Sequence, residues 1–178
     1  MGVNMKSRLL IAAFVAVVGG NAQAAAYEWG SHPLDGKFQD VTVLPGSFAD
    51  TFRFQVPVGY VLVTSTVVSN NLLPKFNIDA GAAYSLFSAG ADTVVGGADD
   101  VLVGGSWSFS GVTGSSPNSS PVGSGWYYYK TTGFVSGTKA GHYSITSDVS
   151  PIPEPETYSM MLAGLGAFGF LARRRRKN

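Results

Sequence analysis

The sequence predicts an all-β exported domain, a two-sheet sandwich or jelly roll, between an N-terminal signal helix and a C-terminal transmembrane helix. Between Tyr27 and Ser150 the apolar segments are short, rich in Val, Thr, Tyr and Phe, and separated by Gly, Pro, Asn or Ser. Helical periodicity is almost absent there, and long apolar runs with basic flanks occur only at the two ends. We therefore expect a signal peptide over residues 1–26, a β-sandwich domain over 27–150 and a sorting segment over 151–178.

The N-terminal segment has the three parts of a secretory signal peptide. Lys6 and Arg8 form a basic start, and Leu9–Val18 is an uninterrupted apolar core. Ala22-Gln23-Ala24 has the small-x-small pattern that signal peptidase cleaves, and Ala24-Ala25-Ala26 offers a second register. We therefore expect signal peptidase to act on this chain and the mature protein to begin just after one of these two sites.

Nine short segments of the body have the composition of strands, bounded by turn residues. The expected strands are Gln39–Val43, Thr51–Val56, Tyr60–Ser69, Lys75–Ile78, Ala83–Phe87, Asp100–Val103, Ser106–Ser110, Gly125–Val135 and Gly141–Val149. The second shows the period of two most clearly, because Phe52, Phe54 and Val56 alternate with polar residues and should point into the core. Eight or nine such strands fit a sandwich or jelly roll. The Ser- and Gly-rich stretch 111–125 is expected to be an exposed loop.

Charge and cysteine content exclude several classes of function. The body carries five Lys or Arg against nine Asp or Glu, a net charge of −4, so it has no basic patch for nucleic acid. The chain has no cysteine, which excludes disulfides, zinc thiolate sites, iron–sulfur clusters and a cysteine nucleophile. The two histidines have no ligand-spaced partner, and no catalytic constellation is recognisable. We therefore expect a non-enzymatic protein without a required cofactor.

The C-terminal segment has three parts that folding alone does not explain. Pro153-Glu154-Pro155 comes first, and an apolar run over Thr157–Ala172 follows. The run ends in a basic cluster of Arg173, Arg174, Arg175, Arg176 and Lys177. Like charges in a row cannot be buried, and the apolar run has no polar face of its own. The arrangement predicts a sorting address that engages a membrane.

This segment resembles the PEP-CTERM sorting signal of Gram-negative bacteria. The matching features are Pro153-Glu154-Pro155, the next residues Glu156-Thr157-Tyr158, the small-residue run Met161–Gly166 and the arginine cluster. The resemblance implies a substrate of exosortase, a membrane cysteine transpeptidase, that is exported across the inner membrane and processed near the motif. Such proteins are associated with bacteria that produce exopolysaccharide and form biofilms or flocs. Exopolysaccharide at the cell surface or in the matrix is therefore an implied partner.

The expected membrane segment runs from Thr157 to Ala172. As a helix its 16 residues would measure about 24 Å, slightly short of the roughly 30 Å hydrocarbon core. The positive-inside rule places the basic cluster in the cytoplasm and the body outside. Two readings stay open, a permanent single-span anchor and a transient one that is removed with the tag. The PEP motif directly before the span favours the transient anchor.

A second resemblance covers part of the body. Phe48-Ala49-Asp50-Thr51-Phe52 matches the pattern that names the FxDxF family of PEP-CTERM proteins, with Phe48, Asp50 and Phe52 as the fixed residues. The aromatic segment from Gly125 to Tyr143 is similar to the closing strands of that family. The resemblance implies an address and a fold, with no activity attached. Asp50 lies at even spacing from the phenylalanines, so it either contacts a metal or ligand or accepts backbone N–H bonds at the strand entry.

The segment from Gly90 to Gly105 contains a local near-repeat of Gly and Asp. It is similar to the Gly/Asp nonapeptide of calcium-binding β-rolls, and Asp92, Asp99 and Asp100 would be the ligands of a calcium ion. Two hairpin arms joined by a Gly-Gly turn explain the same letters, since only two copies occur and their spacing is one residue short. Both readings stay open.

Four aromatic residues in a row, Trp126, Tyr127, Tyr128 and Tyr129, occupy one expected strand. Successive side chains of a strand alternate between its faces, so each face carries two rings. One face is expected to fill the core, and the other could present a platform on which sugar rings stack. We therefore expect an exported, surface or matrix protein that contacts exopolysaccharide. The alternatives are a small secreted polysaccharide hydrolase and a calcium-dependent adhesion module.

Overall fold

The computed structural model describes residues 22–110, 117–151, 160–166 and 168. The apolar core of the expected signal peptide, the PEP motif and the basic cluster all lie outside these residues.

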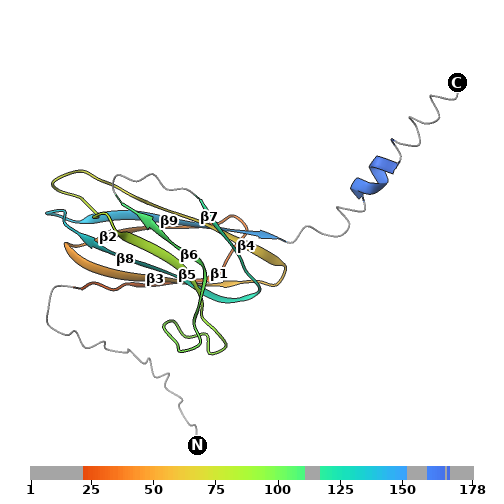
Figure 1. Ribbon diagram of the computed structural model, residues 1–178, viewed down its shortest axis with the longest axis horizontal. Coiled ribbons are helices and arrows are strands. Elements are labelled where there is room, and N and C mark those ends of the chain that lie inside the picture. The colour runs from red at the N-terminus through yellow and green to blue at the C-terminus, as the bar shows by residue number, and fades with distance from the viewer. Residues whose placement is uncertain (1–21, 111–116, 152–159, 167, 169–178) are drawn as a thin grey trace, which may run out of the picture.

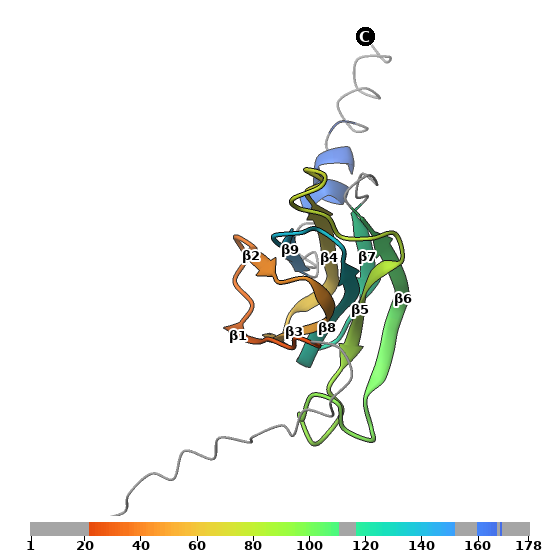
Figure 2. The ribbon, with the colours of Figure 1, turned by 90° about the vertical axis from the view of Figure 1, so that its left-hand side faces the viewer.

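In the part of the chain that the structure describes, nine strands form two packed sheets (Figure 1). The strands are β1 (Ala26–Ser31), β2 (Lys37–Val43), β3 (Gly46–Val56), β4 (Tyr60–Ser69), β5 (Ala82–Ser88), β6 (Val101–Phe109), β7 (Asn118–Pro121), β8 (Gly125–Val135) and β9 (Gly141–Pro151). The first sheet has the order β1-β3-β8-β5-β6 and the second the order β2-β9-β4-β7. Figure 2 shows the two layers from the side, with β2, β9 and β4 on one layer. The expected all-β, two-sheet architecture is confirmed.

Alternation of apolar and polar residues decides which faces meet. On β3, Phe52, Phe54 and Val56 are at most 1% exposed, as predicted, while Gln55 between them is exposed. The opposite layer supplies inward residues such as Val67 and Ile145. The core thus lies between the sheets, and aromatic rings from β3 and β8 fill much of it.

Strand β1 is the main feature that the sequence prediction missed. Residues 26–31 pair with β3 in parallel orientation, at the edge of the first sheet. A bulge between Glu28 and Gly30 shifts the register. Pairing extends to Gln23, which forms an isolated parallel bridge with Phe48. The paired region therefore begins N-terminal to the expected domain start at Tyr27.

Three further boundaries differ from the prediction. Lys75–Ile78 is not a strand and forms only isolated bridges, for example between Ile78 and Val135. The two segments expected at Asp100–Val103 and Ser106–Ser110 form a single strand, β6, because the Gly104-Gly105 pair between them is accommodated by a bulge against β5. Strand β7 lies inside the stretch 111–125, which was expected to be a loop.

Residues 160–166 and 168 are helical, and their large apolar side chains are exposed. Within the residues that the structure describes, no helix has the length and apolar character needed to cross a membrane. The expected transmembrane segment, Thr157–Ala172, falls partly on residues outside that set.

Candidate functional site

The three residues of the F-x-D-x-F pattern lie on the inward face of β3 and meet one side chain of the other sheet. The ring of Phe48 stacks on Tyr143 of β9 with centroids 5.7 Å apart, and Phe52 meets the same ring edge-on at 6.4 Å. Between them, Oδ2 of Asp50 accepts a 2.6 Å hydrogen bond from the Tyr143 hydroxyl. The pattern therefore forms one interlayer contact, centred on Tyr143.

Asp50 is 2% exposed, and its carboxylate accepts hydrogen bonds from two residues that are distant from it in the sequence. Its Oδ1 accepts a 2.8 Å hydrogen bond from the backbone N–H of Ala25, and its Oδ2 accepts from Tyr143. The carboxylate thus accepts a backbone N–H, but this donor belongs to the segment before β1 and not to the entry of β3. Among the described residues, Asp50 belongs to no cluster of carboxylates or imidazoles able to hold a metal ion.

The pKa of the Tyr143 phenol is raised well above its usual value. Burial is the largest cause, and the hydrogen bond to Asp50 and the negative charge of that carboxylate add to it. The phenol therefore stays protonated and donates to Asp50 throughout the physiological pH range. The Thr131 hydroxyl is a second partner of the phenol and lies 2.9 Å from the Tyr143 hydroxyl oxygen.

The expected exposed pair in the aromatic segment does not occur. Tyr127 and Tyr129 point into the core, and Tyr128 on the opposite face is only 4% exposed. Phe87 stacks on Tyr128 at 5.2 Å, and the Tyr128 hydroxyl donates a 2.6 Å hydrogen bond to Asp100. The prediction of a flat, exposed platform is therefore wrong, because the β5–β6 connection and a neighbouring ring cover this face.

Trp126 is the one member of the segment that stays half-exposed, and it too has a partner. The guanidinium of Arg53 lies over its ring, 3.9 Å from the centroid. Arg53 also donates to Glu28 at 3.2 Å and to the carbonyl oxygen of Thr93 at 2.9 Å. Arg53 thus joins Trp126, the edge strand and the β5–β6 connection on the outer face of the first sheet.

The β5–β6 connection brings Asp92, Asp99 and Asp100 together. One carboxylate oxygen from each lies within 4.8 Å of the others. The loop N–H groups of Ala91 and Val94 donate to Asp99 and Asp92, at 2.6 Å and 2.8 Å. Neither a repeated β-roll nor a simple Gly-Gly hairpin results, since the segment forms a run of turns before β6. Figure 2 shows this connection extending beyond the ends of β5 and β6.

A glycine at position 90 lets the backbone of this loop lie close to the Asp99 carboxylate. Gly90 has a φ of +60°, and a Cβ there would lie 2.2 Å from the Asp99 carboxylate. The hydrogen bond from Ala91 is the largest cause of the lowered pKa of Asp99, so this carboxylate is ionised in neutral solution. Oδ1 of Asp100 is buried and has no hydrogen-bond partner, whereas its Oδ2 accepts from Gly96 at 2.7 Å.

His32, directly after β1, is a buried histidine whose partners could not be foreseen from the sequence. Its Nε2 lies 2.9 Å from Oγ of Ser147, and Ser147 Oγ also lies 2.9 Å from the Tyr129 hydroxyl. Burial, the largest cause, lowers the pKa of His32. Since Ser147 is 0% exposed, no substrate can reach this serine–histidine pair, and the cluster is a structural polar network. Only the pairing of β1 with β3, which was not predicted, places His32 here.

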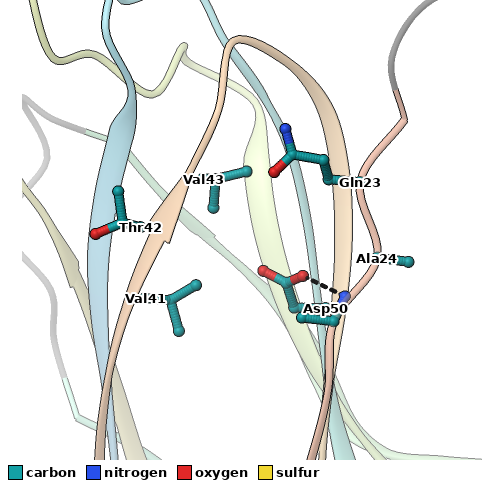
Figure 3. A pocket seen from close by; sticks show the side chains of 7 residues that line it. Gln23, Ala24, Val41, Thr42, Val43 and Asp50 are labelled. Carbon is teal, nitrogen blue, oxygen red and sulfur yellow. Dashed lines mark hydrogen bonds between the residues drawn. The ribbon is translucent and has the colours of Figure 1, made fainter.

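Two small cavities open on the described domain. One, of about 180 Å³, lies between residues 23–25, β2 and Asp50 (Figure 3). The other, of about 200 Å³, lies beside Asp35, Lys37 and Asp148. Both are smaller than the roughly 300–1,000 Å³ of typical small-molecule sites.

Comparison with known proteins identifies the C-terminal segment. Residues 151–176 match the PEP-CTERM protein-sorting motif. No curated protein sequence matches the chain. Among solved structures, the pre-peptidase C-terminal domain of a collagenase from Bacillus anthracis is similar, with 12% identity and a TM-score of 0.41 over 70% of this chain and 94% of that one. The matched motif marks this chain as an exported protein that exosortase processes at its C-terminal tag.

Proposed function

We propose that this protein is a non-enzymatic component of the cell surface or extracellular matrix that associates with exopolysaccharide. The observation that carries the proposal is the sorting motif over residues 151–176. Proteins with such tags are associated with exopolysaccharide-producing bacteria, and the resemblance of Phe48–Phe52 to the FxDxF group of PEP-CTERM proteins agrees with that assignment. Exosortase and signal peptidase are its processing partners.

The tag acts in two stages in this proposal. Thr157–Ala172 anchors the chain transiently as a membrane helix, with the basic cluster in the cytoplasm and the β domain outside. The exposed apolar side chains at Met160, Leu162 and Phe168 are consistent with a segment that a bilayer covers. Exosortase then cuts near Pro153-Glu154-Pro155 and releases the domain to the surface.

Two features of the domain support a non-enzymatic role. The serine–histidine pair at Ser147 and His32 is buried, and the carboxylate of Asp50 is held by Ala25 and Tyr143. A hydrolase would need a cleft with two carboxylates facing a sugar ring. The cavity beside Asp35 and Asp148 is small, and both residues are solvent-exposed.

Mass spectrometry of the intact secreted protein tests the sorting proposal. The expected mass lacks both terminal apolar segments, and material that still carries Arg173–Lys177 would contradict it. Co-sedimentation with purified exopolysaccharide from the producing strain tests the association. We expect the processed protein to sediment with the polymer at low ionic strength, and recovery of all of it in the supernatant would remove exopolysaccharide as a partner.

A second candidate function is calcium-dependent adhesion, favoured by the carboxylates of Asp92, Asp99 and Asp100. Hard cations prefer such oxygen ligands, and three carboxylates within 4.8 Å repel one another without a cation. The hydrogen bonds within the loop use one oxygen of each carboxylate, and the second oxygen would be offered to the ion.

Calorimetry with CaCl₂ on the processed protein tests this candidate. We expect binding heat and a raised melting temperature, since a ligand at 100 times its Kd stabilises the folded state by about 2.7 kcal/mol. Asp92→Asn should abolish both effects, and Asp79→Asn, outside the cluster, should leave them unchanged. Absence of heat and of any thermal shift would refute the calcium site.

A further inference from the structure

The segment that precedes β1 lies along β3 as if it were part of the sheet. Ser47 accepts a 2.9 Å hydrogen bond from the backbone N–H of Gln23, and the carbonyl of Gln23 accepts one of 2.8 Å from Ala49. The carbonyl of Ala25 accepts a 2.8 Å bond from Thr51. The small-x-small site Ala22-Gln23-Ala24 thus lies within a paired run, so the position of cleavage decides which of these contacts the mature protein keeps.

Asp50 is a buried carboxylate whose two hydrogen-bond donors are both neutral. They are the backbone N–H of Ala25 at 2.8 Å and the hydroxyl of Tyr143 at 2.6 Å. Among the residues described, Arg53 lies 3.2 Å from the Glu28 carboxylate and the His142 imidazole lies 3.8 Å from the Asp40 carboxylate, and no ion pair is formed by Asp50. Buried carboxylates are usually paired with a cation, because an unpaired charge is costly to remove from water. In the uncleaved chain, the Asp50 carboxylate therefore has no cationic partner among the described residues.

We propose that signal peptidase cleaves after Ala24 and that the new α-ammonium group of Ala25 becomes the counter-ion of Asp50. Water supplies the hydroxyl that bonds to the Ala24 carbonyl carbon as the Ala24–Ala25 peptide bond breaks. A proton goes to the departing nitrogen of Ala25, which takes up a second proton at neutral pH. This inference rests on the export that the sorting motif implies.

The geometry requires no rearrangement of Ala25. The nitrogen that becomes charged already lies 2.8 Å from Oδ1 of Asp50 (Figure 3), and the bond from Thr51 to the Ala25 carbonyl survives the cut. A charge-assisted hydrogen bond replaces a neutral donor at the same place. Maturation would thus convert a hydrogen bond into a buried ion pair between the N-terminus and the centre of β3.

The cavity beside Asp50 has room for the additional protons of an ammonium group. An amide nitrogen has one N–H to satisfy, whereas an α-ammonium has three. The cavity of about 180 Å³ borders Ala24, Ala25 and Asp50, and Thr42 also lines it. Several water molecules fit into that volume, and they can accept the protons that Asp50 does not. Departure of Gln23 and Ala24 would open the cavity further.

Two other small-x-small registers, Ala24-Ala25-Ala26 and Gly20-Asn21-Ala22, give poorer outcomes for Asp50. Cleavage after Ala26 removes the Ala25 donor and leaves the carboxylate with Tyr143. Cleavage after Ala22, at Gly20-Asn21-Ala22, keeps position 25 as a neutral amide. Cleavage after Ala24 is the register in which the new charge is created at the atom that already contacts Asp50.

The experiment uses the full-length gene in a bacterium that secretes the protein. Mass spectrometry of the N-terminal peptide should identify Ala25 as the first residue, and a chain that begins at Gln23 or Tyr27 would overturn the proposal. The mass of the C-terminal peptide reports exosortase processing separately. A protein that begins at Ala25 but still ends at Asn178 would therefore contradict the proposed sorting and leave this inference intact.

Acetylation rates of the α-amino group test the ion pair itself. In the folded protein we expect the Ala25 amine to react at least tenfold more slowly than in Asp50→Asn. Asp79→Asn, which removes a carboxylate elsewhere, should behave as the wild type. Equal rates in the wild type and Asp50→Asn would overturn the proposal.

Should Asp50→Asn fail to be secreted, the pH dependence of acetylation in the wild type decides. An ion pair raises the α-amino pKa above its ordinary value of about 8, whereas burial without a counter-ion lowers it. Tyr27 and Tyr143 are the titratable neighbours of Asp50, and both phenols have raised pKa values, so neither titrates in this range. A lowered or ordinary α-amino pKa would overturn the proposal.

Discussion

The hydroxyl of Tyr143 donates a 2.6 Å hydrogen bond to Oδ2 of Asp50, and this contact connects the two sheets at the centre of the core. Asp50 lies on β3 of the five-stranded sheet, and Tyr143 lies on β9 of the four-stranded sheet. The rings of Phe48 and Phe52 pack on either side of this bond against the same tyrosine. An apolar interface can slide, but a directional bond to a charged acceptor fixes how the layers face each other.

Tyr143→Phe should therefore lower the free energy of unfolding by about 1–3 kcal/mol, because it leaves a buried carboxylate oxygen without its donor. Tyr129→Phe is the matched control. Its hydroxyl meets a neutral partner, Ser147, so about 0.5–1.5 kcal/mol is expected. Urea denaturation of the secreted protein measures both. If Tyr143→Phe costs no more than Tyr129→Phe, the carboxylate contact has no special role.

Phe54→Ala should cost about 3–5 kcal/mol, the usual range for deleting a buried phenylalanine. Phe54 is 0% exposed, and its ring stacks on Tyr127 and Tyr129 at 6.2 Å and 5.2 Å. Gln55→Ala, on the exposed face of the same strand, should change stability by no more than about 0.5 kcal/mol. A loss below about 1 kcal/mol for Phe54→Ala would mean that the cavity collapses without penalty.

Period-two patterns allowed most of the fold to be predicted, because burial imposes them directly. β3, β4, β8 and β9 were recognised from alternating residues and turn chemistry. β1 was missed because its pairing with β3 joins it to a strand that is not its neighbour in sequence. β7 was missed because Asn118–Pro121 has the composition of a loop and is a strand only through its pairing with β4.

The candidate sites were harder to predict because they depend on what covers a face. Alternation correctly separated Tyr127 and Tyr129 from Trp126 and Tyr128. It could not show that the β5–β6 connection returns over Tyr128, since that contact comes from Asp100. The three aspartates of that connection were singled out by sequence, and their oxygens do lie close together. The burial of His32 depends on β1, so no local signal could have revealed it.

The stability of the domain should fall as the pH drops below about 6.5 because of His32. Burial lowers its pKa in the folded protein, whereas the unfolded chain keeps the ordinary value of about 6.5. Below that pH the unfolded state takes up a proton before the folded state does, so the equilibrium shifts toward unfolding. The loss continues until the pH reaches the folded-state pKa.

His32→Gln removes this titration while its amide can still bond to Ser147. Urea midpoints between pH 8 and pH 5 measure the effect. The wild type and the variant should run parallel above pH 7, and the variant should lose less stability than the wild type below it. An unchanged acid slope in the variant would show that other groups cause the loss.

Glu154→Gln should block C-terminal processing without affecting the fold. Glu154 follows Pro151, the last residue of β9, in the sequence and lies outside the described residues, whereas the described core is formed by residues that precede it. The substitution removes the central charge of the Pro153-Glu154-Pro155 motif, which exosortase is proposed to recognise. Unprocessed chains should stay in the membrane fraction with Arg173–Lys177 attached, and the β circular dichroism and melting temperature should equal those of the wild type.

Glu156→Gln is the matched control, because it removes the same charge two residues away and should be processed normally. Equal loss of processing in both variants would assign the effect to the net charge of the segment, and normal processing of Glu154→Gln would exclude Glu154 as a recognition residue.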